Sequence, residues 1–412
     1  MEKILKSINE IASGNQQEVV IPNRYTAIGD GAFQCCTSSL KRVVIPESVS
    51  WIGEYAFAGC TSLTSVVIPE SVFAINGRAF AGCTSLANIV IPESVFVIGE
   101  RAFENCTSLV SVVIPEGISA IEGRAFAGCT SLANIVIPES VSAIKGRAFT
   151  GCTSLANIVI PKSVSKIEDG AFEGCTSLAS VVIPKSVTEI GESAFYACTS
   201  LASVVIPESV SEIGGCVFAN CSSLERIDVA SDNPKFCGID GALYSKDQTI
   251  LLRVPGTIRS FQVPNSVSKI ESDTFKGCTS LQSVVIPESV SKIGEDAFAN
   301  CSSLKSIDVA SDNSVFCGID GALYSKDQTI LLRVPETVRS FQIPSSVSEI
   351  GRNAFRGCTS LKSVIIPESV TKIGGSAFRG CTSLKSVIIP ESVTKIGENA
   401  FTDCPKLTIT LR

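Results

Sequence analysis

Apolar and polar positions follow a pattern that repeats along almost the whole chain with a period of 23 residues. In one copy of this repeat, apolar side chains stand at Leu86, Ile89 and Ile91, and Pro92 follows directly. Alternate residues of an extended segment point to the same side, so the spacing predicts a short strand with one buried face. Proline has no N–H to donate to a sheet, so Pro92 is expected to end the strand.

The second half of the repeat carries apolar residues at Val95, Ile98, Ala102, Phe103 and Cys106. These positions predict that the chain turns back and closes an apolar interior, so that one repeat forms one coil of a superhelix. A single coil cannot bury enough apolar surface to offset the entropy lost on ordering its backbone. Neighbouring coils must therefore cover both of its flat faces.

The strand-ending position marks the successive copies of the repeat. It recurs every 23 residues at Ile45, Ile68, Ile91, Ile114, Ile137, Ile160, Ile183 and Ile206, and the series continues at Val229, Val263, Ile286, Val309, Ile343, Ile366 and Ile389. Two steps, from Val229 to Val263 and from Val309 to Ile343, are 34 residues long instead. The chain is thus predicted to form a solenoid of about 17 rungs.

The residue before the repeat cysteine is usually glycine, and otherwise mainly asparagine or aspartate, as at Gly59, Asn105 and Asp403. These residue types best tolerate a positive φ, so each is expected to form a tight turn. Asn105, Asn220 and Asn300 also begin glycosylation sequons. A turn is the simpler interpretation, because it accounts for the glycine copies as well.

Three regions depart from the regular repeat. Ile4, Leu5, Ile8 and Ile11 have helical spacing, which predicts a short amphipathic helix in an N-terminal cap over residues 1–15. Residues 16–412 are expected to form a single solenoid, because no change in composition marks a linker. The two longer repeats predict hairpin-like insertions near residues 230–262 and 310–342, which are almost identical in sequence and are explained most simply by duplication of a block.

The pattern L-x-x-(V/I)-x-I-P-x-S-V-x-x-I-G-x-x-A-F-x-G-C-T-S resembles the BspA-like branch of the leucine-rich repeat proteins, over residues ~16–412. The resemblance implies a curved, right-handed leucine-rich-repeat superhelix that is mostly β, with short turns or 3-10 segments on its convex side. The longer repeats resemble a variant unit that interrupts such arrays. The family also implies a location that is frequently the cell surface, and binding to other proteins such as host matrix components.

Cysteine is abundant, and 14 of the 18 cysteines hold the same position in successive repeats. They are expected to fill the interior as small apolar side chains, because thiols in parallel register point the wrong way to form disulfides easily. Many free thiols favour a reducing compartment. The other four, Cys35, Cys216, Cys237 and Cys317, lie outside this ladder and are expected to be the more reactive thiols.

The sequence offers little of the chemistry that enzymes use. It contains no histidine, no C-x-x-C pair and no phosphate-binding loop, so we expect no catalysis, no cofactor and no metal. A net charge of −6 and a pI near 5.1 argue against a general nucleic-acid binder.

The outward positions of the predicted strands are the main candidates for partner binding. In a solenoid these positions form a stripe, which here is smooth, uncharged and partly apolar. Exposed apolar surfaces of this kind usually mark sites where a partner binds. The alternative is that valine is present only because it favours strands. The candidate residues are Val67, Asn88, Val90, Ser111, Val113, Asn134, Val136, Asn157, Val159, Ser180, Val182 and Val205.

Two charged stripes are weaker candidates. Arg78, Arg101, Arg124 and Arg147 follow one another in four consecutive repeats and form either a site for an anionic partner or a solvated edge. A glutamate stripe either collects divalent cations or keeps the protein soluble; it consists of Glu47, Glu70, Glu93, Glu116 and Glu139.

We therefore expect a non-enzymatic, protein-binding solenoid, adhesin-like or host-interacting by family resemblance. The alternative is an intracellular interaction scaffold or a secreted effector. No signal peptide, transmembrane segment or sorting motif is evident, so we expect the chain as written to be cytoplasmic, to leave the cell by a route that the sequence does not show, or to have lost a leader. The resemblance instead indicates the cell surface. The last strand, near Leu407 to Leu411, has no capping segment after it and predicts an end-to-end dimer through the C-terminal coil.

Overall fold

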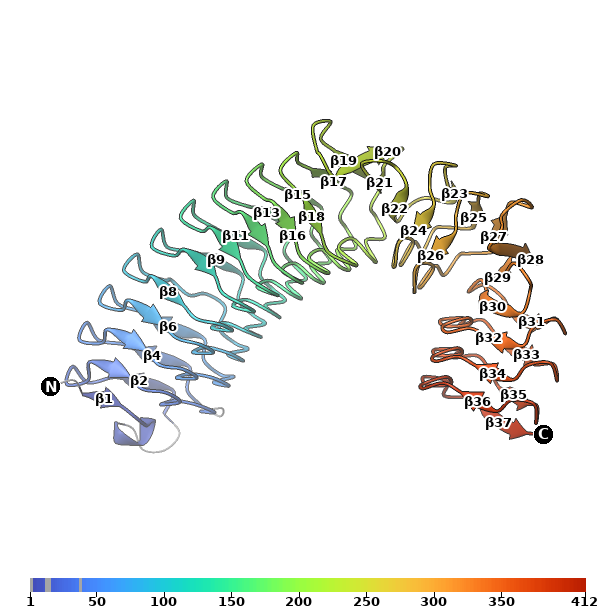
Figure 1. Cartoon of the computed structure of the whole chain (residues 1–412). Coiled ribbons are helices and arrows are strands. Elements are labelled where there is room, and N and C mark those ends of the chain that lie inside the picture. Colours follow the sequence, from blue (N-terminus) through green and yellow to red (C-terminus); the bar gives the residue numbers. More distant parts are fainter. Residues whose placement is uncertain (1–2, 12–15, 37–38) are drawn as a thin grey trace. The chain divides into compact units, whose positions relative to one another are not determined.

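The computed structural model describes residues 3–11, 16–36 and 39–412. The chain forms a parallel β-solenoid of about 17 coils with almost no helix, which confirms the repeat architecture predicted from the sequence. The regular coils contribute one strand to each of two ladders, called here the front ladder and the back ladder (Figure 1). In the coil of Asn88 and Val90 the front-ladder strand is reduced to isolated parallel bridges, from Val90 to Val67 and from Asn88 to Ser111.

The coils gather into two compact units, a division that the sequence did not indicate. Unit 1 comprises Met1–Cys221 and Asp228–Lys235, and unit 2 comprises Ser222–Ile227 and Phe236–Arg412. Each unit is described by itself below. Within unit 1 the coils follow one another in a gently bowed row (Figure 1).

The front ladder contains the strands predicted from the L-x-x-(V/I)-x-I pattern. They pair in parallel and in register, so that equivalent residues of successive repeats lie side by side, as Val44 does beside Val67. In unit 1 they are β2 (Glu18–Val20), β4 (Arg42–Val44), β6 (Ser65–Val67), β9 (Ser111–Val113), β11 (Asn134–Val136), β13 (Asn157–Val159), β15 (Ser180–Val182) and β17 (Ser203–Ile206). In unit 2 they are β23 (Ser260–Gln262), β25 (Ser283–Ile286), β27 (Ser306–Val309), β31 (Ser340–Gln342), β33 (Ser363–Ile365), β35 (Ser386–Ile389) and β37 (Thr408–Leu411), while β19 (Arg226–Val229) spans the division.

The back ladder is made of two-residue strands, where the resemblance implied turns or 3-10 segments. All but β1 end in the repeat isoleucine, which is buried in most coils and anchors the second half of the coil. The exceptions are Ile213 and Ile293, which are half-buried, and Ile396, which is exposed. In unit 1 these strands are β1 (Ile4–Leu5), β3 (Ala27–Ile28), β5 (Trp51–Ile52), β7 (Ala74–Ile75), β8 (Val97–Ile98), β10 (Ala120–Ile121), β12 (Ala143–Ile144), β14 (Lys166–Ile167), β16 (Glu189–Ile190) and β18 (Glu212–Ile213). In unit 2 they are β24 (Lys269–Ile270), β26 (Lys292–Ile293), β32 (Glu349–Ile350), β34 (Lys372–Ile373) and β36 (Lys395–Ile396).

The interior consists of columns of identical side chains. In unit 1 the repeat phenylalanines, from Phe33 to Phe218, stack with their ring centroids between 4.7 and 5.7 Å apart. The expected turn before the repeat cysteine is confirmed, with φ of 71° at Gly59 and 60° at Asn105. A second left-handed position, four residues earlier, was not predicted. Arg101 and its equivalents occupy this position, and the backbone N–H of Arg101 donates a hydrogen bond to the Gly123 carbonyl of the next coil.

Each of the two longer repeats contains a three-stranded antiparallel meander. The strands are β20 (Phe236–Ile239), β21 (Ala242–Ser245) and β22 (Ile250–Arg253) in the first, and β28 (Phe316–Ile319), β29 (Ala322–Ser325) and β30 (Ile330–Arg333) in the second. Asp240 and Gly241 have positive φ, as a two-residue hairpin turn requires. The last strand of each meander joins the back ladder, through β24 and β32 respectively.

The N-terminal segment differs from the amphipathic helix expected within residues 1–15. Ile4 and Leu5 pair in parallel with Ala27 and Ile28, and among the described residues up to 11 one 3-10 turn, η1 (Ile8–Glu10), follows. A helix this short is only marginally stable by itself. The strand instead pairs with the exposed edge of the first coil and buries Leu5. Residues 1–2 and 12–15 of the expected cap lie outside the described part.

Candidate functional site

All 12 predicted binding positions on the front ladder are exposed and lie on one face of unit 1, and they are called the ribbon from here on. Their strands hold them there because the alternate residues, such as Ile135 and Ile158, point inward and are buried. Val90, Val159 and Val182 are 79%, 79% and 77% exposed. From Val67 to Val205 the ribbon crosses six coil steps, about 29 Å at the usual spacing between strands.

The ribbon has charged borders. At its N-terminal end the equivalent positions carry Glu18 and Arg42, whose side chains form an ion pair at 3.7 Å. Three residues beyond the valines of the first coils, the exposed side chains of Glu70, Glu93 and Glu116 form an acidic margin, whereas Lys162 and Lys185 stand at this position after Val159 and Val182. The ribbon is therefore an uncharged strip with an acidic margin beside its first coils and lysines farther along the same side.

The arginine stripe is largely neutralised by its surroundings. Arg101 pairs with Glu100 at 3.3 Å, Arg124 with Glu104 at 3.9 Å and Arg147 with Glu173 at 3.8 Å. Arg78 instead lies over the ring of Tyr55 and donates to its hydroxyl group. All four residues have φ between 55° and 60°. The structure thus brings the four together in a row, but each already has an acidic or aromatic partner.

The glutamate stripe is exposed along its length, from Glu47 to Glu139. Two of its carboxylates accept hydrogen bonds from the backbone of the following coil, Glu93 from the Glu116 N–H at 3.2 Å and Glu139 from the Lys162 N–H at 3.0 Å. In the described residues no group of three or more histidine, cysteine, aspartate or glutamate side chains is placed to hold a metal ion.

An exposed aromatic pair in unit 1 escaped the reasoning from sequence. The rings of Phe73 and Phe96 stack at 5.4 Å, with 39% and 55% of each residue exposed, and Val97 beside them is 39% exposed. The back ladder is interrupted at this point, since β8 and β10 belong to different sheets. The signal was present in the sequence, because other coils carry serine or threonine at this position, as at Ser142.

The repeat cysteines form the interior column that the sequence predicted, and all 18 cysteines are free. Twelve of the 14 in the column are buried, and burial raises the pKa of Cys83, Cys129 and Cys175 to about 12. Of the four outside the column, Cys35 is exposed, whereas Cys216, Cys237 and Cys317 are half-buried.

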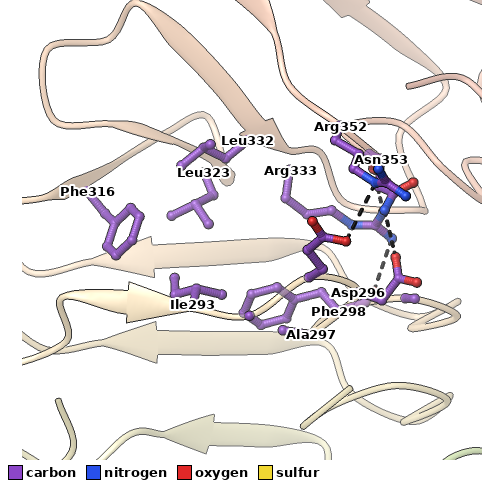
Figure 2. A pocket seen from close by; sticks show the side chains of 13 residues that line it. Ile293, Asp296, Ala297, Phe298, Phe316, Leu323, Leu332, Arg333, Arg352 and Asn353 are labelled. Carbon is purple, nitrogen blue, oxygen red and sulfur yellow. Dashed lines mark hydrogen bonds and ion pairs between the residues drawn. The ribbon is translucent and has the colours of Figure 1, made fainter. Parts of the chain in front are cut away.

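A cavity of about 230 Å³ lies in unit 2 where the second meander meets the preceding coil (Figure 2). Its apolar walls come from the preceding coil and from the meander, and they consist of Ile293, Ala297, Phe298, Ala299, Phe316, Leu323 and Leu332. Its polar lining consists of Glu295, Asp296, Arg333, Arg352 and Asn353, with Gly294 completing the set. The sequence departs from the regular coils here, because the pair Arg333-Val334 stands where regular coils have Ala-Phe; the first meander carries the equivalent pair Arg253-Val254.

Arg333, which lines this cavity, belongs to a buried ion pair. Arg333 Nη2 donates to Glu336 Oε1 at 2.7 Å and to the Phe298 carbonyl at 3.0 Å, and both charged residues are less than a tenth exposed. The N–H groups of Asn300 and Cys301 donate to the Glu336 carboxylate. The Arg333–Glu336 pair thus satisfies the Phe298 carbonyl and the N–H groups of Asn300 and Cys301, in place of the hydrogen bonds that a regular next coil makes. Burial nevertheless raises the pKa of Glu336, although Arg333 acts in the opposite direction.

The other polar groups of the cavity are held from the following coil. Asp296 accepts hydrogen bonds from Asn353 Nδ2 at 2.9 Å and from Arg356 Nη1 at 2.6 Å. At the rim, Arg352 and Glu295 form an exposed ion pair at 3.5 Å. These contacts hold the polar side chains at the opening of the cavity in place.

In the part of the chain that the structure describes, no helix has the length and apolar character needed to cross a membrane.

Comparisons with known proteins agree with the repeat geometry. A family model for the BspA type leucine-rich repeat region, in six copies, matches residues 10–133, 119–238, 255–324 and 335–411. A leucine-rich cell surface protein from Faecalibacterium prausnitzii A2-165 is 30% identical over 97% of this chain and 88% of its own, with a TM-score of 0.50. A leucine-rich repeat protein from Bacteroides ovatus ATCC 8483 is 29% identical over 95% and 91%, with a TM-score of 0.51. No curated protein matches the chain.

Proposed function

Because the chain belongs to the BspA type leucine-rich repeat family, we propose that it is a binding protein whose partner is another protein held on the ribbon of unit 1. The observation that carries the proposal is the continuous exposure of uncharged, partly apolar side chains over seven coils, from Val67 to Val205. Contiguous exposed apolar surface of this kind is uncommon on monomeric proteins outside interaction sites.

Strand propensity alone is a poor explanation of the ribbon valines. In unit 2 three of the equivalent positions carry Val285, Ile365 and Ile388. Three others carry Gln262, Asp308 and Gln342, and the strands β23, β27 and β31 form there all the same. Since the coil does not need valine at this position in order to form a strand, the valine column of unit 1 requires another reason. Binding supplies that reason.

The borders of the ribbon indicate what the partner surface is like. The strip itself offers valine side chains and the side chains of Asn88, Asn134 and Asn157, which contact apolar and neutral polar groups without a charge requirement. The acidic margin formed by Glu70, Glu93 and Glu116 favours a partner with lysine or arginine beside its apolar contact. The partner class is therefore a protein with a flat apolar patch flanked by basic residues.

One relative supports a setting for this interaction. A similar protein from Faecalibacterium prausnitzii is described as a cell surface protein, which supports an adhesin-like or host-interacting role on a cell surface. The second candidate, favoured by the 18 free cysteines, is an interaction scaffold or effector that works where thiols stay reduced.

Capture of partners distinguishes these settings. The intact chain is immobilised and exposed in parallel to extracellular-matrix proteins, to cell-surface extracts and to a cytosolic lysate, beside the variant Val113→Lys/Val136→Lys/Val159→Lys. Matrix or surface proteins retained by the intact chain and lost by the variant support the adhesin-like role. Ribbon-dependent capture from the cytosolic lysate alone supports the scaffold, and capture that the variant leaves unchanged contradicts the ribbon site.

A further inference from the structure

The charged margin of the ribbon changes sign along unit 1. Glu93 and Glu116 stand beside the two coils that precede the coil of Val136, and Lys162 and Lys185 hold the same repeat position beside the two coils that follow it. The side chains of all four charged residues are exposed. Val136 is the middle one of the seven ribbon valines. The charge of the margin therefore reverses about the centre of the ribbon.

This pattern fits a second copy of the same surface turned end for end. In a two-fold pair the same patch serves both partners, so each contact between two different residues forms twice. A half turn about an axis along β11 places two ribbons face to face with their coils in opposite order. Glu93 of each copy then faces Lys185 of the other, and Glu116 faces Lys162. Opposite charges thus meet at four places.

Two contacts on the margin oppose this arrangement. Glu139, in the coil that lies on the axis, meets Glu139 of the second copy, and Glu70 meets Glu208. Glu208 already pairs with Lys185 of its own chain at 3.0 Å, which weakens the second repulsion. Four attractive contacts therefore stand against three repulsive ones, so the charges favour the pair modestly and mainly fix its register.

The polar column of the ribbon fits itself in the same register. Asn88 faces Ser180 and Asn157 faces Ser111, so that a long side chain lies opposite a short one. Asn134 lies opposite its own copy, where each amide can donate to and accept from the other. All five side chains are exposed. Valine meets valine in all seven coils, whereas a shift by one coil leaves a valine unmatched at one end of each ribbon.

The area of the face suits a weak dimer. The ribbon is about 29 Å long, and the seven residues across its middle coil, from Ala133 to Glu139, span roughly 20 Å. The face therefore measures roughly 600 Å² on each copy, and a pair buries about 1,200 Å², which is near the lower limit for specific interfaces. Interfaces of this size commonly belong to transient complexes.

We propose that two copies of this chain associate through their ribbons, about a two-fold axis along β11. This inference rests on the proposed function, because it names a second copy of the chain as a partner of the same site. The two ladders pack face to face, with their strand directions nearly aligned as in a β-sandwich. Because the interface is small, monomer and dimer exchange at micromolar protein concentration.

Sedimentation equilibrium of the full chain, with a reductant present, tests the proposal with two matched variants. Glu93→Lys/Glu116→Lys places lysine at all four paired margin positions, and Lys162→Glu/Lys185→Glu places glutamate at all four. Like charges then meet in each homodimer, so we expect each variant alone to dimerise at least tenfold more weakly than the intact chain. In an equimolar mixture every one of these pairs is opposite in sign, and heterodimers should form at least tenfold more tightly than either homodimer.

Glu139→Gln checks the position of the axis. This substitution removes the like charges that meet there, and the dimer should become at least twofold tighter. Circular dichroism establishes that the variants are folded. A strictly monomeric intact chain, a dimer that both charge variants leave unchanged, or a mixture that associates no more tightly than its components overturns the proposal. A dimer unchanged in both charge variants forms through another surface, such as the C-terminal coil.

Failure of this inference is distinguishable from failure of the proposed function. A chain that stays monomeric, yet captures a foreign protein that the triple-lysine ribbon variant loses, overturns the dimer and leaves the binding role of the ribbon in place. Foreign capture that the triple-lysine variant leaves unchanged, together with heterodimers of the two charge variants, supports the dimer and removes the foreign partner from the ribbon.

Discussion

The Sγ of Cys129 donates a hydrogen bond to the carbonyl oxygen of Phe103 in the preceding coil, at 3.1 Å. Both residues are completely buried. Adjacent coils repeat the bond at nearly the same length, from Cys106 to Phe80 and from Cys152 to Phe126, each at 3.2 Å. Cysteine thus fills a small apolar space and ties each coil to the one before it.

Replacing one ladder thiol tests this role. Cys129→Ala removes the buried sulfur and its hydrogen bond, and we expect it to lower the free energy of unfolding by about 1–2 kcal/mol. The loss stays moderate because the Phe103 carbonyl still accepts from the Cys106 N–H. Urea unfolding under reducing conditions measures the effect, with Cys35→Ala as the exposed control, for which a change within about 0.5 kcal/mol is expected. Equal effects of the two substitutions would count against the ladder bond.

High pH should unfold the protein through the same column. The pKa of Cys83, Cys129 and Cys175 is about 12 in the folded chain, against an ordinary value near 9, so the folded state holds these protons more tightly. The stabilisation is complete below pH 9 and is lost as the pH rises toward 12, at ~1.4 kcal/mol per pH unit for each thiol.

We therefore expect cooperative, reversible unfolding between about pH 9 and pH 12, monitored by circular dichroism with a reductant present. The variant Cys83→Ala/Cys129→Ala/Cys175→Ala should show a shallower dependence on pH in this window. An identical pH dependence in this variant would mean that other groups control alkaline unfolding.

The buried pair of Arg333 and Glu336 should respond to the loss of one partner. Arg333→Met leaves the carboxylate of Glu336 buried without a cation, and we expect a loss of about 3–5 kcal/mol at neutral pH. Burial already raises the pKa of Glu336 in the folded state, and removal of Arg333 raises it further. A carboxyl group with a raised pKa destabilises the fold as the pH rises above its unfolded value, so the variant should be more stable at pH 5 than at pH 8.

A second substitution controls for the charge on Glu336. Glu336→Gln in the Arg333→Met background removes the titrating group and should remove the difference between pH 5 and pH 8. Thermal melts at the two pH values give the comparison. Greater stability of Arg333→Met at pH 8 than at pH 5 would contradict this interpretation.

The exposed pair of Phe73 and Phe96 should contribute more to the binding of apolar molecules at the surface than to the stability of the fold. Phe73→Ser/Phe96→Ser installs the residue type found in other coils, and it gives up a ring stacking worth about 0.5–1.5 kcal/mol. We expect a small decrease in melting temperature and a clear decrease in the fluorescence of the dye ANS. Unchanged ANS fluorescence would mean that the pair is not an accessible apolar surface.

The regular part of the fold could be predicted because each coil repeats its neighbours. A residue such as Ile135 is buried for a reason that the 23-residue period reveals, and the same period exposes Val136. The cysteine column and the turns at Gly59 and Asn105 follow from the same argument. The back ladder was missed because its strands are only two residues long, too short for alternation to be recognised.

The irregular features depend on contacts that a repeat pattern does not contain. At the cavity, Val334 stands in place of a repeat phenylalanine, and the Arg333 guanidinium reaches the Phe298 carbonyl 35 residues away in the chain. The neutralised arginine stripe likewise depends on pairings between coils, such as that of Arg147 with Glu173. The predicted dimer through the C-terminal coil stays a prediction; Leu411 on β37 is 76% exposed, and light scattering at high protein concentration would test it.

The most direct test of the ribbon is the affinity of a captured partner for two matched triple variants. Val113→Lys/Val136→Lys/Val159→Lys places three charges on the ribbon, and Ser119→Lys/Ser142→Lys/Ser165→Lys places three charges on exposed positions of the same coils away from it. Surface plasmon resonance should show at least a hundredfold weaker binding for the ribbon variant, with similar melting temperatures for all three proteins and little change for the serine variant. Equal affinities for the two variants would contradict the assignment of the ribbon as the binding surface.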